Sequence, residues 1–362
     1  MRIPPKIDNI LRKDTQLHSN VHSILNGAMS EKIKWKQLDF FPEYTNHGSE
    51  HIERVLSIAS DLIHEDSEEL LTPLESAVLV LSIAFHDLGM YITVDGFNAL
   101  LHGKLSKQHI SHLHDKHWSS AWDSFFAETQ KYNDQQILAL YGEHTNISLP
   151  SFNDLNMTKK DKLLIGEFIR RNHHRLAHEL IVYGFPTNDE NFKFINETPI
   201  SNASNIIGFI ARSHGLSLRD SIQLSKKLFG DIAFSCPSNI RIFYLMALLR
   251  LADYLDASYE RAPHILSVTR NISSLTSKKE WSWNQVINPN YIWMSEKEYL
   301  YIPCLPDNSE LYLKTSKWIK AVQYELDISW AILGEMYGIK NDTLKLSIRR
   351  IEFRCGTVKK QF

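Results

Sequence analysis

A buried helix that ends in two polar side chains constrains this chain more than any other feature. Residues 77–85 are almost entirely apolar, and His86 and Asp87 follow them directly. Thr72 and Glu75 predict the start of the helix, because they form a capping box around a proline at the first helical position. Adjacent helical residues diverge by about 100°, so both side chains can reach one metal ion near a helix end. Burying these two polar groups is costly, and metal ligation is the leading explanation.

The composition is that of a globular protein without a strong charge bias. With 362 residues, 43% of them apolar, the chain can build a substantial core in one large domain or two smaller ones. A formal net charge of −2 argues against a broad surface for polyanions. The three distant cysteines fit a reducing compartment and not a thiolate zinc site. Without a signal segment or an apolar run long enough to span a bilayer, we expect a cytoplasmic protein with no membrane contact.

The spacing of apolar residues divides the chain into three parts. Residues 1–40 have the pattern of a helical lead-in, and residues 41–262 are mostly helical in spacing. Residues 263–362 read as a C-terminal β/α appendage, with strand-like alternation over 263–312 and a helix over about 315–336. The fold class predicted is therefore mostly α, a helical bundle with a smaller strand-plus-helix appendage. The strand prediction depends on Trp281, Trp283, Tyr291, Ile292, Trp293, Tyr299, Leu300, Tyr301 and Ile302.

A polar insertion at about residues 97–155 is rich in histidine. Five histidines crowd its first part: His102, His109, His112, His114 and His117. Their spacing matches no settled metal-binding motif. We expect a solvated, lid-like segment here, and a metal site is the alternative.

Four further polar residues lie on apolar helix faces, mostly near a helix end: His51, His173, His214 and Asp253. His51 belongs to a helix that we expect Ser49 to cap and that runs to about residue 64. A single histidine on an apolar face is more often a core residue with an ordinary hydrogen-bond partner than a metal ligand. The indication of a metal site comes from finding such residues on several helices. His173 falls inside the apolar stripe of its helix and His174 beside it. We therefore prefer His173 as a ligand and His174 as a supporting or substrate-contacting group.

With His86 and Asp87, these residues form a set of six imidazole and carboxylate ligands without a thiolate. Such a set suits manganese, iron, cobalt, nickel, zinc or magnesium. Six ligands exceed what one tetrahedral zinc ion needs. We therefore expect a divalent metal cofactor and favour two ions.

The order His51, His86-Asp87, Asp253 resembles the HD-domain metal-dependent phosphohydrolases. The closest likeness is to the bacterial HD-CE group, which is associated with conflict and defence systems. The context that carries it is residues 44–55, 85–90 and 248–256, and residues 171–174 and 210–214 look like the extra ligands of two-metal subgroups. The likeness covers roughly residues 20–262, so it implies an HD-domain bundle over 41–262.

The resemblance also implies a division of the ligands. His51, His86, Asp87 and Asp253 would hold a first ion, and His173 and His214 would complete a second site that shares Asp87. The reaction implied is hydrolysis of a nucleotide or other phosphoester by a metal-activated water. The catalytic residues expected are Asp87 as a bridge between the ions, His174 for proton transfer or the leaving group, and Arg250 for phosphate. His47 is an alternative to His174.

One position departs from the family pattern. Met90 stands where many relatives carry lysine. If that lysine neutralises phosphate, Arg54, Arg212 or Arg250 must replace it here. For Arg250 the alternative is an ion pair with Asp253 or with residue 256.

Three functions stay open on the sequence alone. They are a phosphohydrolase, a di-iron HD oxygenase and a non-catalytic module that senses a nucleotide or binds a partner. The near-neutral charge favours a phosphorylated small molecule, above all a nucleotide, over long nucleic acid. HD-CE relatives are often fused to Hsp90-like ATPase modules, so a homo-oligomer and a separately encoded partner are both left open.

Overall fold

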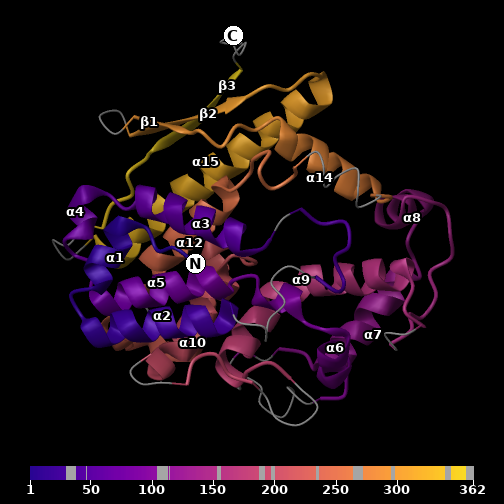
Figure 1. Cartoon of the computed structure of the whole chain (residues 1–362), viewed down its shortest axis with the longest axis horizontal. Helices are drawn as coiled ribbons and strands as arrows, with labels where there is room; N and C mark the ends of the chain where they lie inside the picture. The colour runs from indigo at the N-terminus through magenta and orange to yellow at the C-terminus, as the bar shows by residue number, and fades with distance from the viewer. Residues whose placement is uncertain are drawn as a thin grey trace.

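Helices make up most of the chain in the computed structural model, and its strands form one small sheet (Figure 1). The predicted mostly α fold with a strand-plus-helix appendage is confirmed. No described helix is both long and apolar enough to cross a membrane. The structure describes residues 1–29, 38–45, 47–103, 113, 115–152, 156–186, 192–196, 200–233, 236–263, 272–294, 298–338 and 344–355.

Helix α5 lies at the centre of the bundle and is buried from Glu75 to Phe85. Its capping box is confirmed, and Glu75 also accepts a hydrogen bond from Arg241 Nε at 2.7 Å. The helices that pack against α5 (Pro73–Phe85) include α1 (Pro5–Leu11), α2 (Thr15–Met29), α3 (Ser49–Leu62), α10 (Ser204–Ser213) and α12 (Ile242–Leu255). Shorter or peripheral helices are α4 (Glu65–Glu68), η4 (Ile200–Ala203), α11 (Leu218–Ala233) and η5 (Pro237–Asn239).

The start of α3 differs from the prediction by one residue. Gly48 is the N-cap, and no side-chain hydrogen bond caps the helix. The prediction that Ser49 caps α3 is therefore wrong, because Ser49 is already the first helical residue. The helix ends at Leu62, close to the expected end.

The long helix α9 (Lys159–Tyr183) reaches the end of α5 through the short helix η1 (Leu88–Tyr91). Gly89 makes this approach possible. A Cβ at residue 89 would lie 2.5 Å from the carbonyl oxygen of His173, far inside van der Waals contact. The glycine after the His-Asp pair is thus required by the packing that brings His173 close to Asp87.

The histidine-rich insertion contributes three described helices, α6 (Val94–Leu101), α7 (Trp118–Thr129) and α8 (Asp134–Tyr141), which Figure 1 shows on the side of α9. Trp118 is buried, and its Nε1 donates to Glu179 Oε2 at 2.6 Å. Helix α7 therefore packs one face into the core, whereas other described parts of the insertion, such as residues 134–136 and 148–149, are exposed. His102 and His117 belong to no group of metal-ligating atoms among the described residues. His109, His112 and His114 lie outside the described residues.

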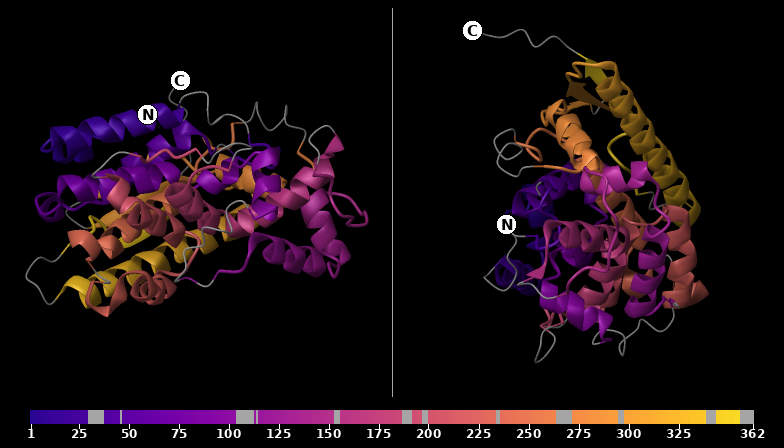
Figure 2. Two further views of the ribbon diagram at one scale, coloured as in Figure 1. Left: turned by 90° about the horizontal axis from the view of Figure 1, so that it is seen from below. Right: turned by 90° about the vertical axis from the view of Figure 1, so that its right-hand side faces the viewer.

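The C-terminal part combines two helices with the sheet: α14 (Leu275–Gln285), β1 (Ile292–Met294), β2 (Tyr299–Cys304), α15 (Ser309–Tyr337) and β3 (Arg350–Cys355). Strand β2 pairs antiparallel with β1 and parallel with β3. Helix α15 packs along α12 and forms one flank of the molecule (Figure 2).

The strand prediction for Trp281 and Trp283 is wrong, because both lie on α14. Ser274 caps this helix by accepting a hydrogen bond from the backbone N–H of Ser277. Both indoles find partners across the fold, Trp281 by donating to the Glu43 carbonyl at 2.8 Å. The strand preference of tryptophan is weak enough for a cap and tertiary packing to override it.

Candidate metal centre

Five helices bring the six predicted ligands together at one point. His51 lies in the first turn of α3 and Asp253 in the last turn of α12. His86 and Asp87 follow the end of α5, His214 follows the end of α10, and His173 lies within α9. His51 and His86 are fully buried, and Asp87 is 7% exposed.

The first group of donor atoms is compact. His51 Nε2 lies 3.3 Å from His86 Nε2, and 3.7 Å from both Asp87 Oδ2 and Asp253 Oδ1. His86 Nε2 lies 3.4 Å from the same Asp87 oxygen and 3.6 Å from the same Asp253 oxygen. Donors bound at about 2.0–2.2 Å to one ion lie roughly 3–3.5 Å apart. His51, His86 and Asp253 form one group of ligand atoms that could hold a metal ion, and Asp87 Oδ2 lies at a comparable distance from both histidines.

The second group uses the other oxygen of Asp87. His173 Nε2 lies 2.6 Å from His214 Nε2 and 3.5 Å from Asp87 Oδ1. His214 Nε2 lies 3.9 Å from that oxygen. The carboxylate of Asp87 therefore stands between two sets of imidazoles, with one oxygen turned to each.

The other ring nitrogen of each histidine is held by an oxygen acceptor. His86, His173 and His214 each direct Nδ1 at the backbone carbonyl three residues earlier, at 2.8, 2.6 and 2.5 Å. His51 directs Nδ1 at Asp256 Oδ2, at 2.5 Å. Because these oxygens accept, Nδ1 donates and each neutral imidazole turns the lone pair of Nε2 to the centre. Two Nε2 atoms 2.6 or 3.3 Å apart cannot both present lone pairs unless a proton or a metal ion lies between them, and a divalent ion held by these donors would meet this need.

The electrostatics of the cluster also favour a cation. Burial lowers the pKa of His51 and of His214. Burial would lower the pKa of His86 as well, but the carboxylates of Asp87 and Asp253 outweigh it and raise that pKa to about 9. Burial alone would raise the pKa of Asp87, yet His86 and its neighbours hold it well below its usual range. A metal ion bound by these donors would displace the proton that His86 holds.

Asp256 is the supporting residue that the sequence analysis did not assign to the centre. It is 3% exposed and accepts hydrogen bonds from His51 Nδ1 and, at 2.7 Å, from Arg54 Nε. The signal in the sequence is its position three residues after Asp253, at the end of an otherwise apolar helix. Arg54 thus supports the histidine through Asp256.

The three arginines expected to replace the family's lysine lie elsewhere. Arg54 binds Asp256, and Arg212 binds Asp115 with two hydrogen bonds of 2.7 and 2.8 Å. Arg250 donates to Glu325 at 2.5 Å and to carbonyls at the end of α10, so its partner is neither of the two aspartates expected. None of the three lines the cavity at the metal centre, because carboxylates or carbonyls already hold each guanidinium.

His174 also lies away from the cavity. Its ring packs against Gly215, so closely that a Cβ at that position would collide with it. Burial, with help from the neighbouring His173, lowers the pKa of His174 to about 3. Its visible contact is with the turn that carries His214.

A cavity of about 780 Å³ adjoins the centre, within the range of ligand pockets. Asp87, His173, His214 and Asp253 are among its lining residues. Its cationic lining residues are Arg170, Arg171 and Arg261, and its aromatic lining residues are Phe40, Phe41, Tyr44, Tyr132, Tyr254, Trp281, Trp283 and Trp318.

His47 and Arg261 connect this cavity to the bridging carboxylate. His47 Nδ1 lies 3.0 Å from Asp87 Oδ2, and Arg261 Nη2 lies 3.1 Å from His47 Nε2. Burial and the charge of Arg261 lower the pKa of His47 to about 4, so the imidazole is neutral near pH 7. No pattern in the sequence singles out Arg261, because it lies in a short irregular segment after α12.

The comparison with protein families agrees with this geometry. The HD-CE family model matches residues 41–328, a segment that contains all six ligands. No curated protein and no solved structure gave a significant match. The match covers most of the chain, so the chain belongs to the HD-CE family, and the resemblance drawn from the sequence is confirmed.

Proposed function

We propose that this member of the HD-CE family is a metal-dependent phosphohydrolase that acts on a nucleotide or other phosphoester with two divalent ions. The observation that carries the proposal is the orientation of Asp87. One carboxylate oxygen faces His51 and His86, and the other faces His173 and His214. This arrangement matches a two-metal site bridged by one carboxylate.

Divalent ions held there would lower the pKa of a bound water and withdraw charge from the phosphoryl oxygens. The protein's contribution is to keep its ligands fixed. Each histidine has its Nδ1 anchored, so its Nε2 does not have to reorient when an ion binds. No serine or cysteine nucleophile is required.

We assign the phosphate-binding role to Arg261. Its Nε is buried without a hydrogen-bond partner among the described residues, and its nearest carboxylate oxygen, on Asp256, is 3.9 Å away. Arg170 and Arg171 also line the cavity, but both bind Glu167, which neutralises part of their charge. Within the described part of the chain Arg261 donates only to the Asp256 carbonyl and to His47, so it is the one of these three arginines whose charge no hydrogen-bonded carboxylate neutralises.

We assign proton transfer to His47 in preference to His174. His47 lines the cavity and contacts Asp87, whereas His174 packs against Gly215. A neutral imidazole beside the leaving group can accept or relay a proton. Arg250 then becomes a positioning residue, since it binds carbonyls in the turn that carries His214.

The lining of the cavity supports a nucleotide as the substrate. The lining combines cationic and acidic side chains with several aromatic rings. Trp283 and Trp318 pack edge to face with centroids 5.2 Å apart, which makes a rigid apolar wall for a base. A nucleoside phosphate offers both the phosphate and the planar group that this lining fits.

The test combines metal analysis with turnover. Purified protein is analysed for bound metal and screened against nucleotides with manganese, cobalt, nickel, magnesium or zinc, with and without oxygen. We expect anaerobic release of phosphate or of a nucleoside monophosphate, and its loss in Asp87→Asn. His144→Ala is the matched control, because His144 is an exposed histidine outside every group of metal-ligating atoms among the described residues.

Each other function predicts a different result. Iron content with strictly oxygen-dependent turnover identifies the oxygenase. Nucleotide binding with equally low turnover in the wild type and Asp87→Asn identifies the non-catalytic module. Either result refutes the hydrolase.

The resemblance to a conflict-associated group suggests a biological setting. We propose that hydrolysis alters a nucleotide pool during infection of a bacterial host. Cells that express the wild-type chain should resist phage better than cells that express Asp87→Asn at the same level. Equal plating efficiency would contradict the role in defence and leave the hydrolase assignment intact.

A further inference from the structure

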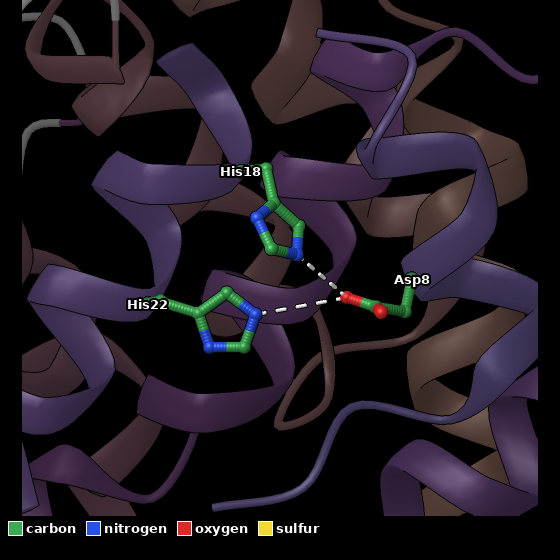
Figure 3. A group of neighbouring side chains, drawn as sticks. All are labelled: Asp8, His18 and His22. Carbon is green, nitrogen blue, oxygen red and sulfur yellow. Dashed lines mark hydrogen bonds and ion pairs between the residues drawn. The ribbon is translucent and has the colours of Figure 1, made fainter. Parts of the chain in front are cut away.

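A second cluster of metal-ligating side chains lies before the family match begins at residue 41. Asp8 on α1 faces His18 and His22 on α2 (Figure 3). The two histidines are four residues apart and share one face of the helix. None of the six ligands of the metal centre described above, called the HD centre from here on, takes part in this cluster.

The distances suit a small divalent ion. Asp8 Oδ1 lies 3.0 Å from His18 Nε2 and 3.6 Å from His22 Nε2. Ligands bound to tetrahedral zinc at about 2.0–2.1 Å lie roughly 3.3 Å apart, between these two values. The two imidazole centroids are 4.4 Å apart, with ring planes tilted by 57°. Small rotations of the rings would therefore complete three of four tetrahedral positions.

One ring nitrogen of the cluster lacks a hydrogen-bond partner among the described residues. His22 Nε2 is buried yet makes no hydrogen bond among the described residues, and it is directed at an oxygen beyond hydrogen-bond range. Burying such a nitrogen without a partner is unfavourable. A cation bound between His22 and Asp8 would satisfy both groups.

The carboxyl group of Asp8 favours its ionised form, which is the form that binds a metal ion. Burial raises its pKa, but hydrogen bonds from Arg12 and His18 outweigh this and lower the pKa of Asp8. Arg12 Nε donates to Asp8 Oδ2 at 2.6 Å, which leaves Oδ1 turned to the two histidines. The side chains of Asp8, His18 and His22 are 16%, 22% and 37% exposed, so an ion can enter from solvent.

We propose that Asp8, His18 and His22 bind one divalent transition-metal ion, with zinc as the best match to the ligand set, independently of the HD centre. Three protein ligands leave the fourth position to water. The ion would join α1 to α2, and both helices pack on α5, whose end carries His86 and Asp87. The bound ion would therefore stabilise the packing of α1 and α2 on α5.

The test measures metal stoichiometry in full-length protein whose HD centre is disabled by His86→Ala and Asp87→Ala. After incubation with Zn²⁺ and dialysis, we expect one zinc per chain, and none once His22→Ala is added. His144→Ala is the matched control and should retain the ion. Co²⁺ should give a tetrahedral absorption spectrum that His18→Ala and His22→Ala abolish.

A second measurement follows stability. Zn²⁺ should raise the melting temperature of the disabled protein and of its His144→Ala control, but not of the His22→Ala protein. Equal zinc content and an equal shift in melting temperature with and without His22→Ala would overturn the proposal. If the disabled background does not fold, the same comparison in the wild-type background decides. His22→Ala should then lose one ion per chain and keep its turnover.

Discussion

Asp256→Asn tests how the fold orients the metal-facing histidines. Asp256 is not one of the six ligands, but its Oδ2 accepts from His51 Nδ1 at 2.5 Å and its Oδ1 from Arg54 Nε at 2.7 Å. Asparagine has the same shape and only one acceptor oxygen, so it can serve one of these donors and not both. If the amide nitrogen turns to His51, the imidazole loses the acceptor that fixes its Nδ1 proton.

Two costs follow from this geometry. Removing the outer acceptor of a metal-bound histidine lowers metal affinity by about 10–100-fold, which equals about 1.4–2.7 kcal/mol. The guanidinium of Arg54 also loses a charged partner, and such a hydrogen bond contributes about 1.5–3 kcal/mol. Arg54 is 19% exposed and lies 3.8 Å from Glu260, so water and this second carboxylate replace part of the loss. We expect the metal-free variant to be less stable by about 1–2 kcal/mol.

The two costs are measured separately. Equilibrium dialysis with Mn²⁺ near neutral pH gives the affinity, and urea unfolding in the presence of a chelator gives the stability. Glu260→Gln is the matched control, since it removes the same charge beside Arg54 without touching His51. A manganese affinity of Asp256→Asn within twofold of the wild type would refute the reasoning that Asp256 orients His51.

Four further outcomes are expected. Gly89→Ala should lower the free energy of unfolding by about 1–3 kcal/mol in urea titrations, because its Cβ would lie 2.5 Å from the carbonyl oxygen of His173. Burial lowers the pKa of His178 to about 3 from 6.5, so the folded protein should lose stability as the pH falls below 6.5. This histidine adds up to about 1.4 kcal/mol per pH unit to that slope, and His178→Gln should remove its share in chemical unfolding measured at several pH values. Burial raises the pKa of Cys304 to about 12, so a thiol reagent at pH 8 should label Cys304 only after unfolding, with Cys304→Ser as the control. Arg261→Ala should raise KM for the phosphorylated substrate at least tenfold in steady-state assays, and an unchanged KM would exclude phosphate contact.

The parts of the fold predictable from sequence were those that local patterns determine. The capping box of α5 and the apolar faces with His51, His173 and Asp253 depend on residues within one or two turns of helix. Placing a polar residue on an apolar face is enough to point it at the core. The meeting of the six ligands therefore needed only that the helices pack around one centre.

The parts that were missed depend on side chains far apart in the chain. Arg250 finds Glu325 on α15, and Arg261 finds His47, more than two hundred residues earlier. Helical periodicity does not reveal such pairs, because the sequence alone does not show which of many possible acceptors each arginine contacts. Trp283 was misassigned for a related reason, because its packing against Trp318 is decided by tertiary structure.

The position of each histidine in its helix explains why one of them needs a partner from another helix. A helical side chain leans toward the N-terminus, over the preceding turn. His86, His173 and His214 all follow a complete turn, so a carbonyl three residues earlier lies under the ring and fixes Nδ1. His51 is the third residue of α3 and has no helical turn before it. Its acceptor must come from elsewhere, and Asp256 at the end of α12 supplies it. Asp256→Asn should therefore impair the first metal group, where His51 has no local replacement, and spare the second, where both histidines keep their own carbonyls.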